Sequence, residues 1–158
     1  MTATPTRRIL FVCMGNICRS PAAENVFRHL AARSPLASHL ECDSAGTLGL
    51  HAGSPPDPRM QEAGRNRGYP MTGCARAFTP ADFDHFDLIL AMDDENLADL
   101  RSRAPTAADR AKIQPFCRYL TRHPATEIPD PYYGGDAGFG EVLDLLEDGC
   151  ANLLASLR

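Results

Sequence analysis

A short loop between an apolar strand and a helix start near the N-terminus constrains this chain most. Residues 9–12, Ile-Leu-Phe-Val, form a β-branched and aromatic run typical of a buried strand. Ser20 and Pro21 mark a helix start, because serine caps a helix and proline fits its first position. The loop between them directs backbone N–H groups toward the positive end of the helix dipole, a site suited to a phosphate dianion. Gly15 can take a backbone conformation that other residues resist.

Cys13 and Arg19, at either end of this loop, have a spacing that suits phosphoryl chemistry. A cysteine thiol is mostly protonated at neutral pH, but N–H donors, a helix N-terminus and a guanidinium favour the thiolate. We therefore expect Cys13 as the nucleophile, with the planar fork of Arg19 opposite two phosphoryl oxygens. Ser20 is expected to donate a hydrogen bond to the Cys13 sulfur, and Asn16 to hold the loop's shape. The alternative for Cys13, a buried apolar cysteine, does not account for Gly15 and Arg19.

The other cysteines do not form a recognisable framework. Cys18 has two interpretations, which stay open: it fills space, or it forms a reversible disulfide with Cys13 once an oxidant converts the reactive thiolate to sulfenic acid. A zinc site would need closely paired ligands, and none of the five histidines pairs with another. We therefore expect no metal and no cofactor. The remaining cysteines are scattered singly: Cys42, Cys74, Cys117 and Cys150.

A second candidate loop, residues 128–135, is rich in proline, tyrosine and glycine. Asp130 is its only ionisable acid. Phosphoryl transfer from an aryl ester needs a proton for the leaving oxygen, so Asp130 is the candidate general acid. The same residue alone would be read as an Asp-Pro turn, and Tyr132 and Tyr133 as packing residues. Beside a candidate acid, however, their planar faces would make walls for a phenol ring.

Together the two loops resemble the low-molecular-weight protein tyrosine phosphatase family. Its signature C-x-G-N-x-C-R-S-P matches residues 13–21, and its acid loop D-P-Y-Y-G matches residues 130–134. The resemblance covers nearly the whole chain, because further segments follow in the family's order: 43–47, 55–59, 75–76, 87–93 and 96–97.

This resemblance implies a phosphatase that hydrolyses phosphotyrosine monoesters through a phosphocysteine intermediate. It makes Cys13 the nucleophile, Arg19 the transition-state clamp, Asp130 the acid and then the base, and Ser44 a support for Asn16. It implies phosphotyrosine proteins as partners, with an autophosphorylating tyrosine kinase as one candidate, and phosphate or other oxyanions as ligands. The expected substrate-binding residues are Met14, Gly15, Asn16, Ile17, Cys18, Ser20, Leu50, Tyr132 and Tyr133.

Three positions depart from the family pattern. Gly73 stands where many members have a histidine, so an interaction between that histidine and the acid at Asp93 should be missing. Leu50 replaces an aromatic residue at the cleft rim, which would make one wall of the phenol slot aliphatic. Gly140, in place of a common acidic residue, is expected to have no functional consequence.

Strands that alternate with helices along the chain predict the fold. The predicted α/β fold is a single domain of three layers, in which a central four-stranded parallel sheet has helices on both faces and the ligand at the carboxyl ends of the strands. The stretch 46–58 is expected as a cleft wall, with His51 as a solvated loop residue rather than a base. The other strands are predicted at 40–44, 86–92 and 113–116, and the helices at 21–33, at 57–67, after Asp93 and from 139 to 157.

Length and composition are consistent with one phosphatase domain over residues 1–158, with 1–6 as a flexible polar tail. An apolar fraction of 44% and a charged fraction of 23% are typical of soluble globular proteins, and no long apolar run predicts a membrane span. The net charge of −4 argues against nucleic acid as a partner. Because the N-terminus lacks the pattern of a secretory signal, we expect the cytoplasm.

Two other functions share this loop. A thiol-dependent arsenate reductase of the same fold would use further cysteines in a relay, whereas Cys74 and Cys117 are far apart in the sequence. A non-catalytic phosphotyrosine-binding module would lack one of the three catalytic residues. Because all three are present, the sequence favours the hydrolase.

Overall fold

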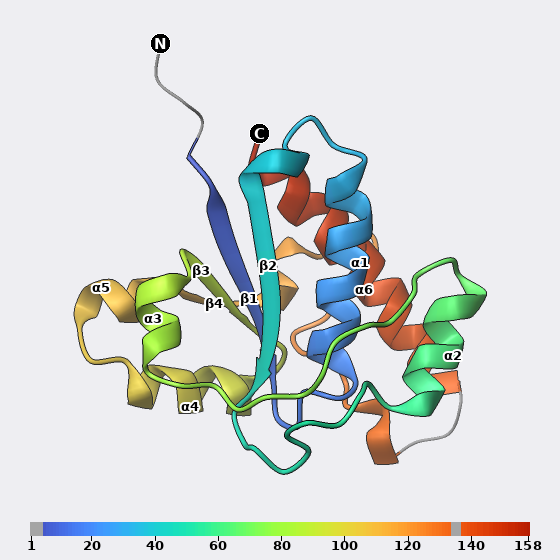
Figure 1. The fold of residues 1–158 in the computed structure, drawn as a ribbon, viewed down its shortest axis with the longest axis horizontal. Helices are drawn as coiled ribbons and strands as arrows, with labels where there is room; N and C mark the ends of the chain where they lie inside the picture. Colours follow the sequence, from blue (N-terminus) through green and yellow to red (C-terminus); the bar gives the residue numbers. More distant parts are fainter. Residues whose placement is uncertain (1–4, 134–136) are drawn as a thin grey trace.

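A parallel sheet of four strands forms the centre of the computed structural model, which describes residues 5–133 and 137–158. The strand order is β2-β1-β3-β4, and every neighbouring pair is parallel (Figure 1). All four predicted strands are thus confirmed. Their bounds are Arg7–Cys13 for β1, Leu40–Gly46 for β2, Leu88–Ala91 for β3 and Ile113–Pro115 for β4.

Helices cover both faces of the sheet, which confirms the three layers (Figure 1). Because side chains alternate along a strand, β1 sends Ile9 and Phe11 into one core and Leu10 and Val12 into the other. The first core packs against α1 and α6, and the second includes residues of α3 and α4. The helices are α1 (Arg19–Ala32), α2 (Pro58–Asn66), α3 (Ala81–His85), α4 (Asp94–Arg103), α5 (Ala107–Ala111) and α6 (Ala137–Ser156).

Several helices begin at the capping residues that the sequence marks. The Asp57 carboxylate accepts a hydrogen bond from the Arg59 N–H at 2.8 Å at the start of α2, and Asp93 caps α4 in the same way. Helix α5, which is capped by Thr106, was not predicted. Three 3₁₀ helices were also missed: η1 (Ala37–His39), η2 (Phe116–Tyr119) and η3 (Pro131–Tyr133).

The carboxyl ends of the three adjacent strands β2, β1 and β3 lie at one edge of the sheet and bring distant segments together. Strand β1 ends at Cys13, opposite Gly46 at the end of β2. Gly46 forms a further parallel bridge to Ala77. This edge is where an open α/β sheet binds its ligand, as predicted. In the part of the chain that the structure describes, no helix is both long and apolar enough to cross a membrane.

Candidate active site

The loop that joins β1 to α1 curls around the sulfur of Cys13. The Cys13 side chain is only 3% exposed. Its Sγ lies 3.0 Å from the Ser20 hydroxyl oxygen and accepts the backbone N–H of Asn16 at 3.3 Å. Two of the contacts that would stabilise a thiolate are therefore in place. Ser20, at the start of α1, is fully buried behind the sulfur.

The left-handed backbone conformation in this loop belongs to Asn16, with φ 58°, although Gly15 is the residue whose lack of a side chain would allow it most easily. Asparagine tolerates this conformation better than most residues. Its Nδ2 donates to the hydroxyls of Ser20 at 2.8 Å and Ser44 at 2.9 Å, and its Oδ1 accepts the Arg76 N–H at 2.9 Å. The expected contact between Ser44 and Asn16 is therefore present.

The position of Gly15 has no room for a side chain. A Cβ at this position would lie 3.1 Å from Cδ2 of His51, so any side chain would press against the imidazole. His51, expected to be a solvated loop residue, is instead half-buried and lines the cleft. Its ring centroid lies 6.1 Å from that of Tyr132. The loop of residues 47–57 thus forms a cleft wall, as predicted.

Arg19 is 3% exposed, and fixed partners aim its guanidinium. One terminal nitrogen donates to the Asp93 carboxylate at 2.6 Å and to the Ile128 carbonyl at 3.1 Å. The other lies 3.5 Å from the Asp130 carboxylate. Burial alone would lower the pKa of Arg19, but the charges of Cys13, Asp93 and Asp130 and the hydrogen bond that Arg19 donates to Asp93 outweigh it and raise the pKa. The sequence predicted a helix start at Asp93, and the resemblance made Asp93 the partner of the absent histidine; the ion pair of Asp93 with Arg19 was missed.

Asp130 lines the same cleft, immediately before η3. One of its carboxylate oxygens accepts the backbone N–H of Tyr132 at 3.0 Å, and the other faces Arg19. The Tyr132 ring is 37% exposed, and the Arg59 guanidinium lies 5.5 Å from its centroid. The side chain of Tyr133 and the whole of Gly134, both part of the predicted acid loop, lie outside the described residues.

A cleft at this edge brings the three predicted catalytic residues together. Leu50 stands at its rim with a 69% exposed side chain, as expected for an aliphatic wall. Asn16 and Ser20, predicted to bind substrate, do not line the cleft and instead hold the loop from behind. The lining residues are Cys13, Met14, Gly15, Ile17, Cys18, Arg19, Leu50, His51, Asp130 and Tyr132.

Cys18 also lines the cleft, but its thiol resists ionisation. Burial raises its pKa first, and the charges of Asp57, Cys13 and Asp130 add to this effect. Its two interpretations, packing and a disulfide with Cys13, both remain predictions. Over residues 5–133 and 137–158, no three His, Cys, Asp or Glu side chains are grouped to hold a metal ion.

Gly73, which stands where many family members have a histidine, borders a small cavity behind the phosphate-binding loop. Gly73, with φ 101°, lines this cavity together with Asn16, Glu24 and Asp43. Glu24 is 7% exposed and accepts the Ser44 hydroxyl at 2.6 Å, a support that the sequence did not reveal. Gly140, the third position that departs from the family pattern, contributes a backbone contact: the Gly140 carbonyl accepts a hydrogen bond from the Arg67 guanidinium at 3.1 Å.

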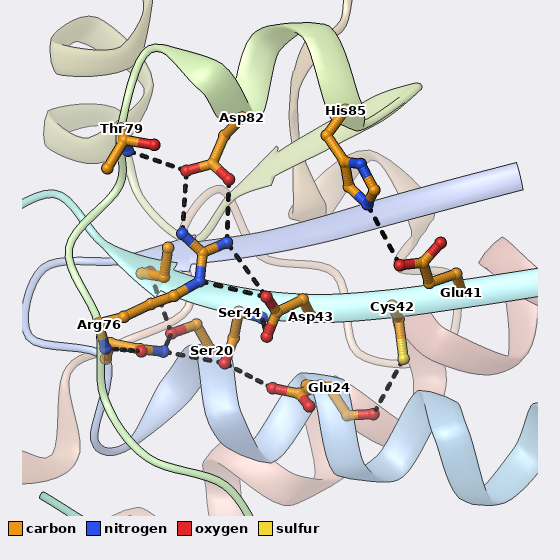
Figure 2. Close-up of polar contacts among 12 residues, drawn as sticks. Ser20, Glu24, Glu41, Cys42, Asp43, Ser44, Arg76, Thr79, Asp82 and His85 are labelled. Carbon is orange, nitrogen blue, oxygen red and sulfur yellow. Dashed lines mark hydrogen bonds and ion pairs between the residues drawn. The ribbon is translucent and has the colours of Figure 1, made fainter. Parts of the chain in front are cut away.

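Figure 2 shows these supporting contacts behind the loop, where Ser20, Ser44 and Glu24 connect α1 with β2. They form one continuous polar chain from the sulfur to a buried carboxylate. Such a chain fixes the loop more firmly than backbone contacts alone, because each buried polar group has a partner.

Comparisons with known proteins agree with this geometry. The family described as low molecular weight phosphotyrosine protein phosphatase matches residues 8–158. The chain is 50% identical over 150 residues to a putative low molecular weight protein-tyrosine-phosphatase of Synechocystis sp., covering 95% of this chain and 96% of the relative. It is 43% identical over 143 residues to the human low molecular weight phosphotyrosine protein phosphatase, covering 90% of each.

Solved structures are similar as well. A protein tyrosine phosphatase from Entamoeba histolytica with Hepes in the active site has a TM-score of 0.93 and 44% identity, covering 96% of this chain and 97% of that one. YfkJ from Bacillus subtilis has a TM-score of 0.90 and 42% identity, covering 98% and 96%. With the signature loop, the sheet and these relatives in agreement, the chain belongs to the low molecular weight phosphotyrosine protein phosphatase family and is a cysteine-dependent protein tyrosine phosphatase.

Proposed function

We propose that Cys13, Arg19 and Asp130 carry out phosphotyrosine hydrolysis in this cleft in two steps. In the first, the Cys13 thiolate attacks phosphorus in line with the bond to the tyrosine oxygen and forms phosphocysteine, while Asp130 donates a proton to the leaving phenol. In the second, Asp130 takes a proton from water, which attacks phosphorus and releases phosphate and the Cys13 thiolate. The observation that carries the proposal is that all three side chains line one cleft at the carboxyl end of the sheet.

Arg19 stabilises the transition state in both steps. Its guanidinium is fixed before substrate arrives, because Asp93 and the Ile128 carbonyl hold one of its nitrogens. A preorganised cation aimed at the equatorial phosphoryl oxygens costs no reorganisation during the reaction. Ser20 lies 3.0 Å from the sulfur and stabilises it both as attacking thiolate and as leaving group.

The substrates we propose are proteins that carry phosphotyrosine. Leu50 and Tyr132 at the cleft rim supply an aliphatic and an aromatic wall for the phenol ring. A role for Tyr133 in substrate binding is implied by the family resemblance alone. A tyrosine kinase that phosphorylates itself is one such substrate, and it is implied by the family resemblance alone. The Entamoeba histolytica relative has Hepes in its active site. Hepes carries a sulfonate, which supports binding of phosphate and other oxyanions here.

The proposed chemistry favours a reducing compartment such as the cytoplasm, in which a reactive thiol persists. Arsenate reduction is not favoured. The relatives reported above are named as phosphatases. The two cysteines weighed as a relay also differ in character: Cys74 is exposed, whereas burial, followed by the charges of Glu127 and Asp94, raises the pKa of Cys117 to about 11.

The test is hydrolysis of para-nitrophenyl phosphate at mildly acidic pH in the presence of a metal chelator. We expect Cys13→Ser to abolish turnover, and Asp130→Ala to lower kcat by about 10²- to 10⁴-fold. Replacing para-nitrophenyl phosphate by phenyl phosphate, a poorer leaving group, should widen the Asp130→Ala defect. Cys74→Ser, which removes an exposed cysteine, is the matched control and should leave turnover unchanged. Full activity of Cys13→Ser would refute the mechanism.

A further inference from the structure

Arg76 lies behind the phosphate loop and joins it to two other elements (Figure 2). Its two terminal nitrogens donate to the two oxygens of Asp82 in α3, each at 3.0 Å. Its Nε donates to the Asp43 carboxylate of β2 at 3.1 Å. Its backbone takes part as well: the N–H donates to Asn16 Oδ1 at 2.9 Å, and the carbonyl accepts the Gly46 N–H at 2.9 Å.

This arrangement is rigid, because its carboxylates are themselves fixed. Asp82 is 6% exposed and also accepts the Thr79 N–H at 2.8 Å. Asp43 accepts the Ser44 N–H at 2.8 Å with its other oxygen. A two-pronged contact between a guanidinium and a carboxylate fixes orientation as well as distance. The backbone N–H of Arg76 therefore has a defined position relative to the loop.

That N–H determines which way the Asn16 amide points. An amide oxygen only accepts and an amide nitrogen only donates. With Oδ1 bound to the Arg76 N–H, Nδ2 must face Ser20 and Ser44, and both hydroxyl oxygens accept from it. The hydroxyl hydrogen of Ser44 then points to the Glu24 carboxylate at 2.6 Å, and that of Ser20 is available to the Cys13 sulfur at 3.0 Å.

We propose that Arg76, held by Asp82 and Asp43, is a positioning residue that orients the Asn16 amide so that Ser20 presents its hydrogen to the sulfur of Cys13. Arg76 does not line the cleft and touches no reacting atom. Arg76 acts on the sulfur only indirectly, by orienting Asn16 and through it Ser20. The inference rests on the proposed function, in which Cys13 reacts as a thiolate. If the guanidinium is released, the Asn16 amide gains freedom to rotate. The Ser20 hydroxyl then has the Ala45 carbonyl, at 3.5 Å, as an alternative acceptor.

The experiment compares Arg76→Met and Asp82→Asn with a control that joins the same strand and helix. Glu41 of β2 contacts His85 of α3 at 3.2 Å, but this exposed pair lies apart from the loop (Figure 2). Glu41→Gln therefore weakens a link between β2 and α3, together with the exposed ion pair of Glu41 with Arg8 of β1, without touching the chain of hydrogen bonds to the sulfur. A control with the same two elements separates positioning of the loop from general support of the sheet.

The readout is the rate at which iodoacetamide alkylates the catalytic cysteine, measured from pH 4 to 9 by peptide mass spectrometry so that exposed Cys74 is counted separately. The charged or titratable side chains that line the cleft around this sulfur are Arg19, Cys18, Asp130, His51 and Tyr132, and no variant alters them. For Arg76→Met and Asp82→Asn we expect the midpoint of the alkylation profile to rise by about one pH unit, a tenfold slower reaction below the midpoint. The Glu41→Gln profile should coincide with that of the unaltered protein.

The inference is overturned if Arg76→Met and Asp82→Asn melt at lower temperature but keep the alkylation profile of the unaltered protein. In that case the ion pairs support only the fold. If Arg76→Met does not fold, Asp82→Asn decides by the same criterion, because it keeps the shape of the side chain. Should the unaltered protein itself alkylate like an ordinary thiol, with a midpoint near ~8.5, the proposed function fails together with this inference.

Discussion

The Asp93 carboxylate divides its two oxygens between the fold and the active site. Oδ1 accepts the Asn96 N–H at 2.7 Å and caps α4. Oδ2 accepts a hydrogen bond from the Arg19 guanidinium at 2.6 Å. An asparagine has one acceptor where aspartate has two, so Asp93→Asn must turn its NH₂ group toward one of these two donors. The substitution therefore breaks either the cap or the contact with Arg19.

The expected magnitudes follow from these two contacts. Loss of a helix cap costs about 1 kcal/mol, and loss of a hydrogen bond to a charged group costs about 1.5–3 kcal/mol. We expect Asp93→Asn to lower the free energy of unfolding by about 2 kcal/mol and Asp93→Ala, which loses both contacts, by about 3 kcal/mol. With its main anchor weakened, Arg19 can move toward Asp130, 3.5 Å away. A loss of about 10- to 100-fold in kcat/KM should result, equivalent to about 1.4–2.7 kcal/mol.

Urea unfolding at pH 7 and steady-state hydrolysis of para-nitrophenyl phosphate measure the two effects separately. The matched control is Thr106→Ala, because Thr106 caps α5 by accepting the Asp109 N–H at 3.1 Å and has no place in the cleft. This control should lose about 1 kcal/mol of stability and keep its kcat/KM. If Asp93→Asn loses stability but stays within twofold of the unaltered protein in kcat/KM, Arg19 does not need Asp93 and the reasoning is refuted.

Three further substitutions probe the core, a buried carboxylate and the cleft rim. The Asp148 carboxylate accepts hydrogen bonds from the three backbone N–H groups of residues 121–123. Burial alone would raise the pKa of Asp148, but these hydrogen bonds outweigh burial and lower the pKa. Its stabilisation is therefore complete above the unfolded value near ~3.9 and is lost as pH falls through the lower folded pKa. Asp148→Asn should cost about 2 kcal/mol in urea unfolding at pH 7 and less at pH 3; an equal loss at both pH values would contradict this. Gly149→Ala would place a Cβ 2.4 Å from the buried Phe116 ring, so it should cost about 1–3 kcal/mol in thermal unfolding, and an unchanged melting temperature would count against this packing. Leu50→Tyr adds an aromatic wall at the rim and should raise kcat/KM for a phosphotyrosyl peptide by about two- to tenfold, with little change for para-nitrophenyl phosphate; equal effects on both would argue against a rim contact.

The parts of the fold that the sequence predicted correctly depend on neighbours along the chain. The apolar run before Cys13 gave β1, and Ser20-Pro21 gave the start of α1. The caps at Asp57 and Asp93 were equally local, since a capping side chain binds an N–H only two or three residues ahead. Helix α5 was missed because five residues carry too little periodicity to separate a helix from a loop.

Gly15 shows where local reasoning was incomplete. A glycine in a phosphate loop suggests a left-handed backbone, yet the neighbouring Asn16 adopts it. The space around Gly15 is limited by His51, which lies 36 positions further along the chain. No local pattern reveals such an approach, because the conformation of one loop is fitted to the wall that another loop provides.

The residues that support the active site lie at or just beyond the carboxyl ends of neighbouring strands. Ser44 lies near the end of β2, Cys13 ends β1, and Asp93 follows β3 by two residues. These three strands are adjacent, in the order β2-β1-β3, so their carboxyl ends deliver the three side chains to one edge. Strand order is not encoded in periodicity, which is why the link between Arg19 and Asp93 could not be read from the sequence. Once the order is known, however, the residues within two positions of each strand end become the natural candidates, and the Arg19–Asp93 pair follows from topology together with charge.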